Sequence, residues 1–153
     1  MIKVLFICHG NICRSPMAEY ILKDMVKKSR RQCDFFIESA ATSMEEIGND
    51  IHRGTKGILN KYKIPYERRR ARQMERKDYE RYDYIVGMDE WNRRNMMRIL
   101  GDDPEEKVFL LLDFTGSPRD IADPWYTGEF EATYRDITEG CGAFLKWLED
   151  LRG

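Results

Sequence analysis

Short apolar runs alternate along this chain with segments in which apolar residues recur at helical spacing. The short runs have the length and composition of buried strands, and they lie at residues 2–7, 34–39, 83–87 and 107–112. The periodic segments predict helices, and they lie at residues 16–30, 51–62, 89–100 and 130–151. Strands that alternate with helices are typical of an α/β fold. We therefore expect three layers: a four-stranded parallel sheet with helices on both faces.

Length, charge and cysteine content narrow the class of protein. The 153 residues suit a single domain, residues 1–153, and the net charge of −1 implies no general attraction to nucleic acid or membranes. No apolar run approaches the ~20 residues of a membrane helix. The first strand follows Met1 so closely that we expect no signal peptide. The chain has four cysteines, namely Cys8, Cys13, Cys33 and Cys141. They lack the spacing of a zinc site and are too few for a disulfide framework. We therefore expect a cytoplasmic protein without a metal.

Residues 8–16, CHGNICRSP, connect the first predicted strand to the first predicted helix. Gly10 lets the backbone amides of this loop turn inward, and the helix behind them adds N–H donors and a positive dipole. The guanidinium of Arg14 can hold two oxygens of a tetrahedral oxyanion. We expect Ser15 to cap the helix and Pro16 to begin it. In such surroundings a thiol ionises readily, which favours Cys8 as a nucleophile over a small buried side chain.

A nucleophilic thiol beside a site for a tetrahedral oxyanion could cleave a phosphate ester. This reaction also needs an acid that protonates the departing oxygen. The best candidate is Asp123, because Pro124 restricts it to extended conformations and so directs its carboxyl group. Trp125 and Tyr126 beside it can stack on an aromatic leaving group. An Asp-Pro pair is also a common turn, and the spacing leaves three other acids open: Asp89, Asp113 and Asp120.

Residues 61–77 are rich in lysine and arginine, with Arg68, Arg69, Arg70 and Arg72 close together. The simplest interpretation is a solvated surface. The alternative is a basic rim that attracts acidic peptides or phosphates to a nearby site. No nucleic-acid-binding motif accompanies these charges.

Residues 4–19, VLFICHGNICRSPMAE, resemble the phosphate loop of the low-molecular-weight protein tyrosine phosphatases. The run from Asp123 to Tyr126 resembles the acid loop of that family, and residues 39–43, 71–73 and 88–90 are similar to other family segments. The resemblance covers nearly the whole chain. The larger tyrosine phosphatases place a histidine before the nucleophile, where this chain has Ile7.

The resemblance implies a metal-free phosphotyrosine phosphatase that acts on proteins or peptides, releases inorganic phosphate and works as a monomer. Cys8 would form a phosphocysteine intermediate, Arg14 would bind phosphate with the amides of residues 9–14, and Asp123 would act as acid and then as base. Asn11, Ser15 and Ser39 would form the polar network that shapes the loop. The substrate-binding residues would be His9, Gly10, Asn11, Ile12, Cys13, Glu45, Trp125 and Tyr126.

Cys13 has two open roles. It matches the second cysteine of the family's loop, which could trap oxidised Cys8 as a reversible disulfide. It could equally be a small side chain that faces the core.

Three residues depart from the family pattern. His9 stands where many members have an apolar residue, and Glu45 lies where an aromatic side chain commonly reaches the pocket wall. Arg69 stands where the family often has a histidine. The first two bear on which peptides fit, and the third on the polar network.

Three other functions compete with this one. Arginine phosphatases of the same scaffold carry a smaller, polar residue in place of Ile12, so Ile12 favours an aromatic substrate. Arsenate reductases need two further cysteines close to each other in mid-chain, and Cys33 and Cys141 do not form that pair. An inactive phosphate-binding module would not need the complete set of Cys8, Arg14 and Asp123.

Overall fold

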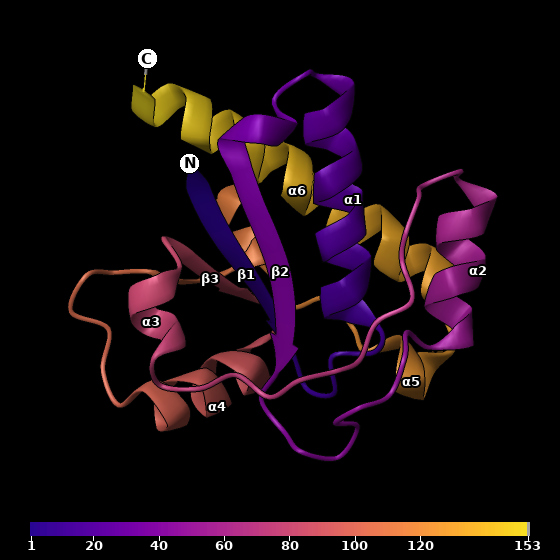
Figure 1. The fold of residues 1–153 in the computed structure, drawn as a ribbon, viewed down its shortest axis with the longest axis horizontal. Coiled ribbons are helices and arrows are strands. Elements are labelled where there is room, and N and C mark those ends of the chain that lie inside the picture. Colours follow the sequence, from indigo (N-terminus) through magenta and orange to yellow (C-terminus); the bar gives the residue numbers. More distant parts are fainter. Residues whose placement is uncertain (153) are drawn as a thin grey trace.

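The computed structural model describes residues 1–152, which form a four-stranded, all-parallel sheet with helices on both faces (Figure 1). The strands are β1 (Ile2–Cys8), β2 (Phe35–Ala41), β3 (Tyr84–Gly87) and β4 (Val108–Leu110). The helices are α1 (Arg14–Lys28), α2 (Arg53–Lys61), α3 (Asp78–Arg81), α4 (Glu90–Leu100), α5 (Pro124–Thr127) and α6 (Phe130–Arg152). Two short 3-10 helices, η1 (Gln32–Asp34) and η2 (Leu111–Phe114), complete the elements.

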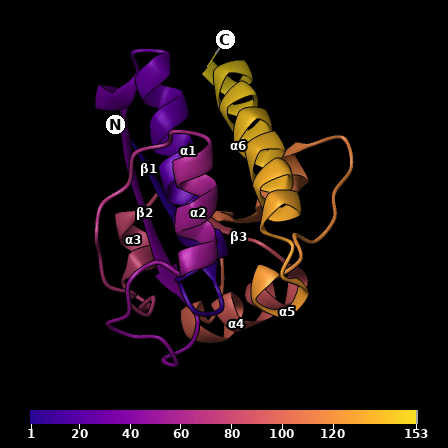
Figure 2. The ribbon, with the colours of Figure 1, turned by 90° about the vertical axis from the view of Figure 1, so that its right-hand side faces the viewer.

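Side chains that alternate along β1 divide the core into two layers. Val4 and Phe6 point to one face of the sheet, into the cluster that includes the buried residues of α1 and α6. Leu5 and Ile7 point to the other face, into the cluster that holds Met96 of α4. Figure 1 shows α1 and α2 to the right of β1 and β2 and α3 to their left, and in Figure 2 α1, α2 and α6 lie on the side that faces the viewer. The predicted three-layer α/β architecture is therefore confirmed.

The strand order β2-β1-β3-β4 places β1 inside the sheet, with β2 on one side and β3 on the other. The chain thus moves to one side of β1 first and to its other side later. In open parallel sheets such a switch leaves a crevice at the carboxyl ends of the strands. Cys8 is the last residue of β1 and lies at that crevice.

The start of α1 corrects one prediction. The helix begins at Arg14, with Cys13 at the N-cap position, and Ser15 lies within the first turn. Ser15 does not cap the helix because its hydroxyl group contacts the Cys8 thiol and the Asn11 amide instead. Pro16 remains compatible with the helix because the first turn needs no intrahelical N–H bond there.

The fourth strand is shorter than its apolar run suggests. β4 ends at Leu110, and the next residues form η2, where the Asp113 carboxylate accepts a hydrogen bond from the Leu110 amide. Among the helices of residues 1–152, none combines the length and apolar character needed to cross a bilayer.

Candidate active site

The loop after β1 folds around the Cys8 sulfur. The Asn11 backbone N–H donates to Sγ at 3.3 Å, and the Ser15 hydroxyl lies 3.1 Å from the same atom. Asn11 rather than Gly10 takes the left-handed conformation of the loop, with φ of 59°. A Cβ at Gly10 would lie 3.2 Å from Cγ of Glu46, so a side chain at this position would require the Glu46 side chain to shift slightly.

A buried polar network stands behind this loop. The Asn11 side-chain amide donates to the hydroxyl groups of Ser15 (2.8 Å) and Ser39 (2.9 Å). Ser39 in turn donates to the buried Glu19 carboxylate at 2.5 Å. The structure therefore brings together the three residues expected to shape the loop, although Asn11 lies between β1 and α1, Ser15 in α1 and Ser39 in β2.

Both terminal nitrogens of the Arg14 guanidinium have protein partners. One terminal nitrogen donates to Asp89 Oδ2 at 2.6 Å and to the Ile121 carbonyl at 2.7 Å, while the other lies 3.5 Å from Asp123 Oδ2. Its Nε is buried and has no protein partner. Burial disfavours the charge, but Cys8, Asp89 and Asp123 outweigh it and raise the pKa of Arg14. The guanidinium is thus fixed in place with hydrogen-bonding capacity left for an anion.

Asp123 lies directly before α5 and caps that helix. Its backbone is extended (φ −79°, ψ 115°), and its side chain accepts a hydrogen bond from the Trp125 amide at 3.1 Å. The competing acids are occupied elsewhere: Asp89 binds Arg14, Asp113 binds Arg93, and Asp120 accepts from the Glu90 amide. Of the four candidate acids, Asp123 is the one that lines the cavity described next.

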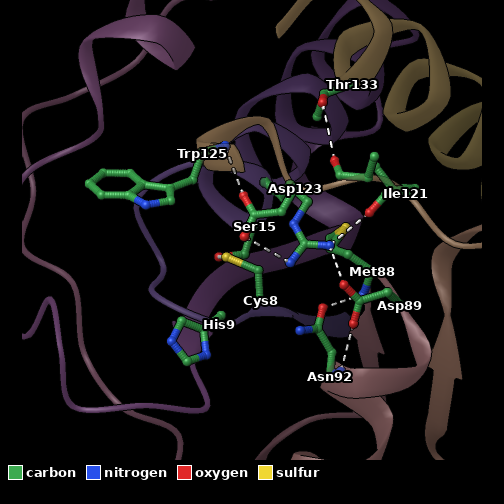
Figure 3. A network of polar contacts seen from close by, with 12 residues as sticks. Cys8, His9, Ser15, Met88, Asp89, Asn92, Ile121, Asp123, Trp125 and Thr133 are labelled. Carbon is green, nitrogen blue, oxygen red and sulfur yellow. Dashed lines mark hydrogen bonds and ion pairs between the residues drawn. The ribbon is translucent and has the colours of Figure 1, made fainter. Parts of the chain in front are cut away.

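A small cavity of about 90 Å³ opens beside Cys8. Figure 3 shows the Cys8 side chain between Trp125 and His9, with Asp123 close by. The cavity is lined by Cys8, His9, Gly10, Ile12, Cys13, Glu45, Glu46, Asp123, Trp125 and Tyr126. Of the residues expected to contact substrate, Asn11 is the exception, because its side chain points into the network behind the loop. Glu46 was not predicted, and only its place beside Glu45 could have indicated it.

A polar pair of side chains lies on one side of the cavity mouth, and an aromatic pair lies on the other. On one side, His9 Nε2 and Glu45 Oε2 lie 2.8 Å apart, which ties residues 43–50 to the phosphate-loop motif. On the other side, the exposed ring of Trp125 packs edge-on against His52, with centroids 5.6 Å apart. A wider hollow of about 910 Å³ near Phe109 and Trp147 contains no cysteine and no comparable anion site.

The other cysteines differ from Cys8 in their surroundings. Burial, and then the proximity of Cys8, raise the pKa of Cys13 to about 12, so Cys13 stays protonated and does not compete as a nucleophile. Cys33 is exposed in η1, which precedes β2 and so lies at the opposite end of the sheet from Cys8. Cys141 is buried in α6. No disulfide forms among these four residues, and disulfide trapping by Cys13 stays a prediction.

The basic segment is not uniformly a solvated surface. Arg68 and Arg70 are exposed, as that interpretation requires. Arg69 instead turns inward and donates to the Asn11 carbonyl at 2.8 Å, and Arg72 pairs with the buried carboxylate of Asp78. The expectation of a solvated surface is therefore wrong for Arg69, whereas Arg72 stays partly exposed while it pairs with Asp78.

Residues 3–152 match the family model described as low molecular weight phosphotyrosine protein phosphatase. The chain belongs to this family. The phosphatase is 38% identical over 151 residues to the low molecular weight protein-tyrosine-phosphatase YfkJ of Bacillus subtilis, with 97% of each chain covered.

Solved structures agree with this assignment. The crystal structure of Bacillus subtilis YfkJ covers 100% of the phosphatase and 98% of its own chain at 36% identity, with a TM-score of 0.96. The low molecular weight tyrosine phosphatase SP-PTP of Streptococcus pyogenes is 40% identical, covers 97% and 93%, and has a TM-score of 0.86. The Drosophila arginine phosphatase is 33% identical, covers 96% and 98%, and also has a TM-score of 0.86.

Proposed function

We propose that the phosphatase hydrolyses phosphotyrosine in proteins or peptides with Cys8 as nucleophile, Arg14 as phosphate-binding residue and Asp123 as general acid and base. One observation carries this proposal. The Cys8 thiol and the Asp123 carboxylate line the same cavity, and Arg14 stands beside Asp123 with its Nε unpaired.

The phosphoryl group would bind between the loop and the guanidinium. Because one terminal nitrogen of Arg14 is committed to Asp89 and Ile121, its Nε and second terminal nitrogen remain for two phosphate oxygens. The backbone amides of residues 9–14 and the N-terminus of α1 supply further donors. Such fixed donors stabilise charge that develops in the transition state without reorganising.

The first step transfers the phosphoryl group to sulfur. The Cys8 thiolate attacks phosphorus, an S–P bond forms, and the bond from phosphorus to the tyrosine oxygen breaks. The hydrogen bonds from the Asn11 amide and the Ser15 hydroxyl stabilise the thiolate before attack. Asp123, protonated, gives its proton to the departing tyrosine oxygen.

The second step regenerates the thiolate. Asp123, now a carboxylate, takes a proton from a water molecule, and the water oxygen attacks phosphorus. A P–O bond forms, the S–P bond breaks, and inorganic phosphate leaves. Arg14 holds the phosphoryl oxygens in both steps, and its hydrogen bond to Asp89 keeps the guanidinium in position throughout.

The walls of the cavity favour an aromatic leaving group. Ile12 supplies an apolar wall, and Trp125 and Tyr126 offer exposed rings at the mouth. A flat phenyl ring fits between such surfaces, whereas the charged guanidinium of phosphoarginine gains less from apolar contact.

The chain supplies every residue assigned to the reaction, which supports a monomer that acts as one domain. The two steps above use only protein groups and water, so the proposal includes no metal. A nucleophilic thiol must stay reduced, and Cys8 together with three further free cysteines fits a reducing compartment such as the cytoplasm.

Variants of the nucleophile and the acid test the mechanism. We expect Cys8→Ser to abolish turnover of aryl phosphates. Asp123→Ala should lose about 10²–10⁴-fold in kcat on substrates with poor leaving groups, and much less on good ones, because a good leaving group departs without a proton. Equal losses on both substrate classes would remove Asp123 from the role of acid.

Phosphotyrosine and phosphoarginine peptides of matched sequence test the substrate class. We expect a higher kcat/KM for phosphotyrosine with the wild type. Ile12→Thr should shift the ratio toward phosphoarginine, because a hydroxyl group replaces the apolar wall. A preference of the wild type for phosphoarginine would favour the activity named for the Drosophila relative.

A further inference from the structure

Arg69 has no role in the proposed catalytic steps, yet its guanidinium contacts the phosphate loop. One terminal nitrogen of its guanidinium donates to the Asn11 carbonyl at 2.8 Å, and the other donates to the Ser39 hydroxyl at 3.2 Å. Its backbone amide is fixed as well, because it donates to Asp50 Oδ1 at 3.1 Å. The side chain is therefore held at both ends, unlike those of its exposed neighbours Arg68 and Arg70.

The hydrogen bond to the Asn11 carbonyl bears on the backbone conformation of the loop. Asn11 has a left-handed backbone, an uncommon conformation for a residue with a side chain, and its own amide points at the Cys8 sulfur. A hydrogen bond to the Asn11 carbonyl fixes the peptide plane that follows this residue. Arg69 thus supports the conformation in which the Asn11 N–H faces Sγ.

Arg69 also brings a positive charge close to the thiol. It reaches Ser39, which the Asn11 side chain links to Ser15, the hydroxyl partner of Cys8. Ser39 additionally donates to Glu19, whose negative charge Arg69 helps to balance. Burial lowers the pKa of Arg69, and Glu19, Tyr20 and Cys8 oppose that change. A guanidinium nevertheless stays protonated in proteins, so the charge persists at every working pH.

Several other groups influence the same thiol. The titratable and charged groups around Cys8 are His9, Cys13, Arg14, Glu19, Glu45, Glu46, Arg69, Asp89 and Asp123. Arg14 and Arg69 are the two fixed cations of this set. Both cations have carboxylate partners, since Arg14 contacts Asp89 and Asp123 and Arg69 lies near Glu19, and both interact with the Cys8 thiol.

We propose that Arg69 is a positioning residue for the phosphatase reaction, which holds the Asn11 peptide and supplies a permanent positive charge that favours the thiolate of Cys8. The inference rests on the proposed role of Cys8 as nucleophile. A histidine at this position could form hydrogen bonds, but its charge would disappear as pH rises through the range near neutrality. Arginine extends the thiolate-favouring charge to higher pH.

The pH dependence of Cys8 alkylation tests the proposal. The experiment uses a Cys33→Ser background, because Cys33 is exposed and would also react. Iodoacetamide inactivation is followed against pH for the parent, Arg69→Gln, Arg69→Lys and, as matched control, Arg68→Gln. We expect Arg69→Gln to move the half-maximal pH upward by about one unit and to lower kcat/KM at neutral pH roughly tenfold. Arg69→Lys should keep most of the parent profile, and Arg68→Gln all of it.

An unchanged half-maximal pH in folded Arg69→Gln would overturn the proposal, even if activity fell. If Arg69→Gln does not fold, Arg69→His replaces it: its alkylation rate relative to the parent must fall as pH rises above about 7, and a constant ratio overturns the proposal. Cys8→Ser separates the two hypotheses. Full activity in Cys8→Ser would refute the proposed function, whereas an inactive Cys8→Ser with an unchanged Arg69→Gln profile refutes only the role of Arg69.

Discussion

Arg14 shows how one side chain divides its hydrogen bonds between the protein and a ligand. Asp89 and the Ile121 carbonyl fix one terminal nitrogen, and Nε stays unpaired in a buried position. Asp89 has a second task, because its other oxygen accepts from the Asn92 amide and caps α4. A single carboxylate therefore connects the geometry of the phosphate site to the start of a helix on the other face of the sheet.

Asp89→Asn tests this connection. Asparagine can keep the helix cap with its one oxygen, but it then presents an amide N–H group to Arg14. Losing a charge-assisted hydrogen bond should lower kcat/KM for aryl phosphates about 10- to 100-fold and weaken inhibition by inorganic phosphate. Asp113→Asn, which removes a comparable bond to Arg93 away from the cavity, is the control. An Asp89→Asn enzyme with unchanged kcat/KM and phosphate inhibition would contradict the assigned role.

The individual residues differ in how far the sequence predicts them. Cys8 and Arg14 lie within one strand–loop–helix unit, so their spacing and chemistry are visible locally. Arg69 contacts Asn11 from 58 residues further along the chain, and a local sequence pattern cannot predict a contact over that separation. The position of Ser15 predicts a helix cap, but its hydroxyl group contacts the nearby Cys8 thiol instead.

At the scale of elements, α6 packs against η2 and α1 to close one face of the sheet. The periodicity predicts its apolar stripe, whereas the apolar run places Leu111 and Leu112 of η2 at the end of a strand. The apolar residues of η2 satisfy a strand pattern equally well, and the hydrogen bond from the Leu110 amide to Asp113 turns the chain. The four-residue helices α3 and α5 are too short for periodicity to reveal.

Two glycines of α6 provide a matched test of this packing. A Cβ at Gly140 would lie 2.5 Å from Cγ of the buried Leu111, while a Cβ at Gly142 would meet nothing within 4 Å. We expect Gly140→Ala to lower the free energy of unfolding by about 1–3 kcal/mol through overpacking. Gly142→Ala should raise it by about 0.5–1 kcal/mol, because alanine favours the helix. Urea denaturation measures both, and changes of the same sign in the two variants would contradict the packing described.

At the scale of the whole molecule, a few contacts tie the surface segments to the sheet. Asp50 lies in the loop between β2 and α2 and accepts hydrogen bonds from the Ile51 and Arg69 amides and from Lys56. Burial alone would raise the pKa of Asp50, but these bonds and the charge of Lys56 lower it to about 2. The ionised form of Asp50 is therefore more stable in the folded chain than in the unfolded one.

This difference predicts a pH-dependent stability. Because the folded pKa lies below the unfolded value, the contribution of Asp50 is complete above about pH 4 and is lost as pH falls through about 2. We expect Asp50→Asn to cost about 1 kcal/mol near neutral pH, since the site is partly solvated. The difference from wild type should shrink at about pH 3. Urea denaturation at both pH values measures it, and a difference that does not vary with pH would contradict this account.

In the proposed mechanism the phosphoryl group passes through the Cys8 sulfur. Asp123→Ala, mixed with an aryl phosphate that has a good leaving group, should slow hydrolysis of the intermediate more than its formation. Acid quenching followed by mass spectrometry of the peptide that contains Cys8 then measures the intermediate directly. We expect one phosphoryl group on Cys8, and none on the corresponding peptide of Cys8→Ser. A phosphoryl group on another residue, or turnover in Cys8→Ser, would contradict it.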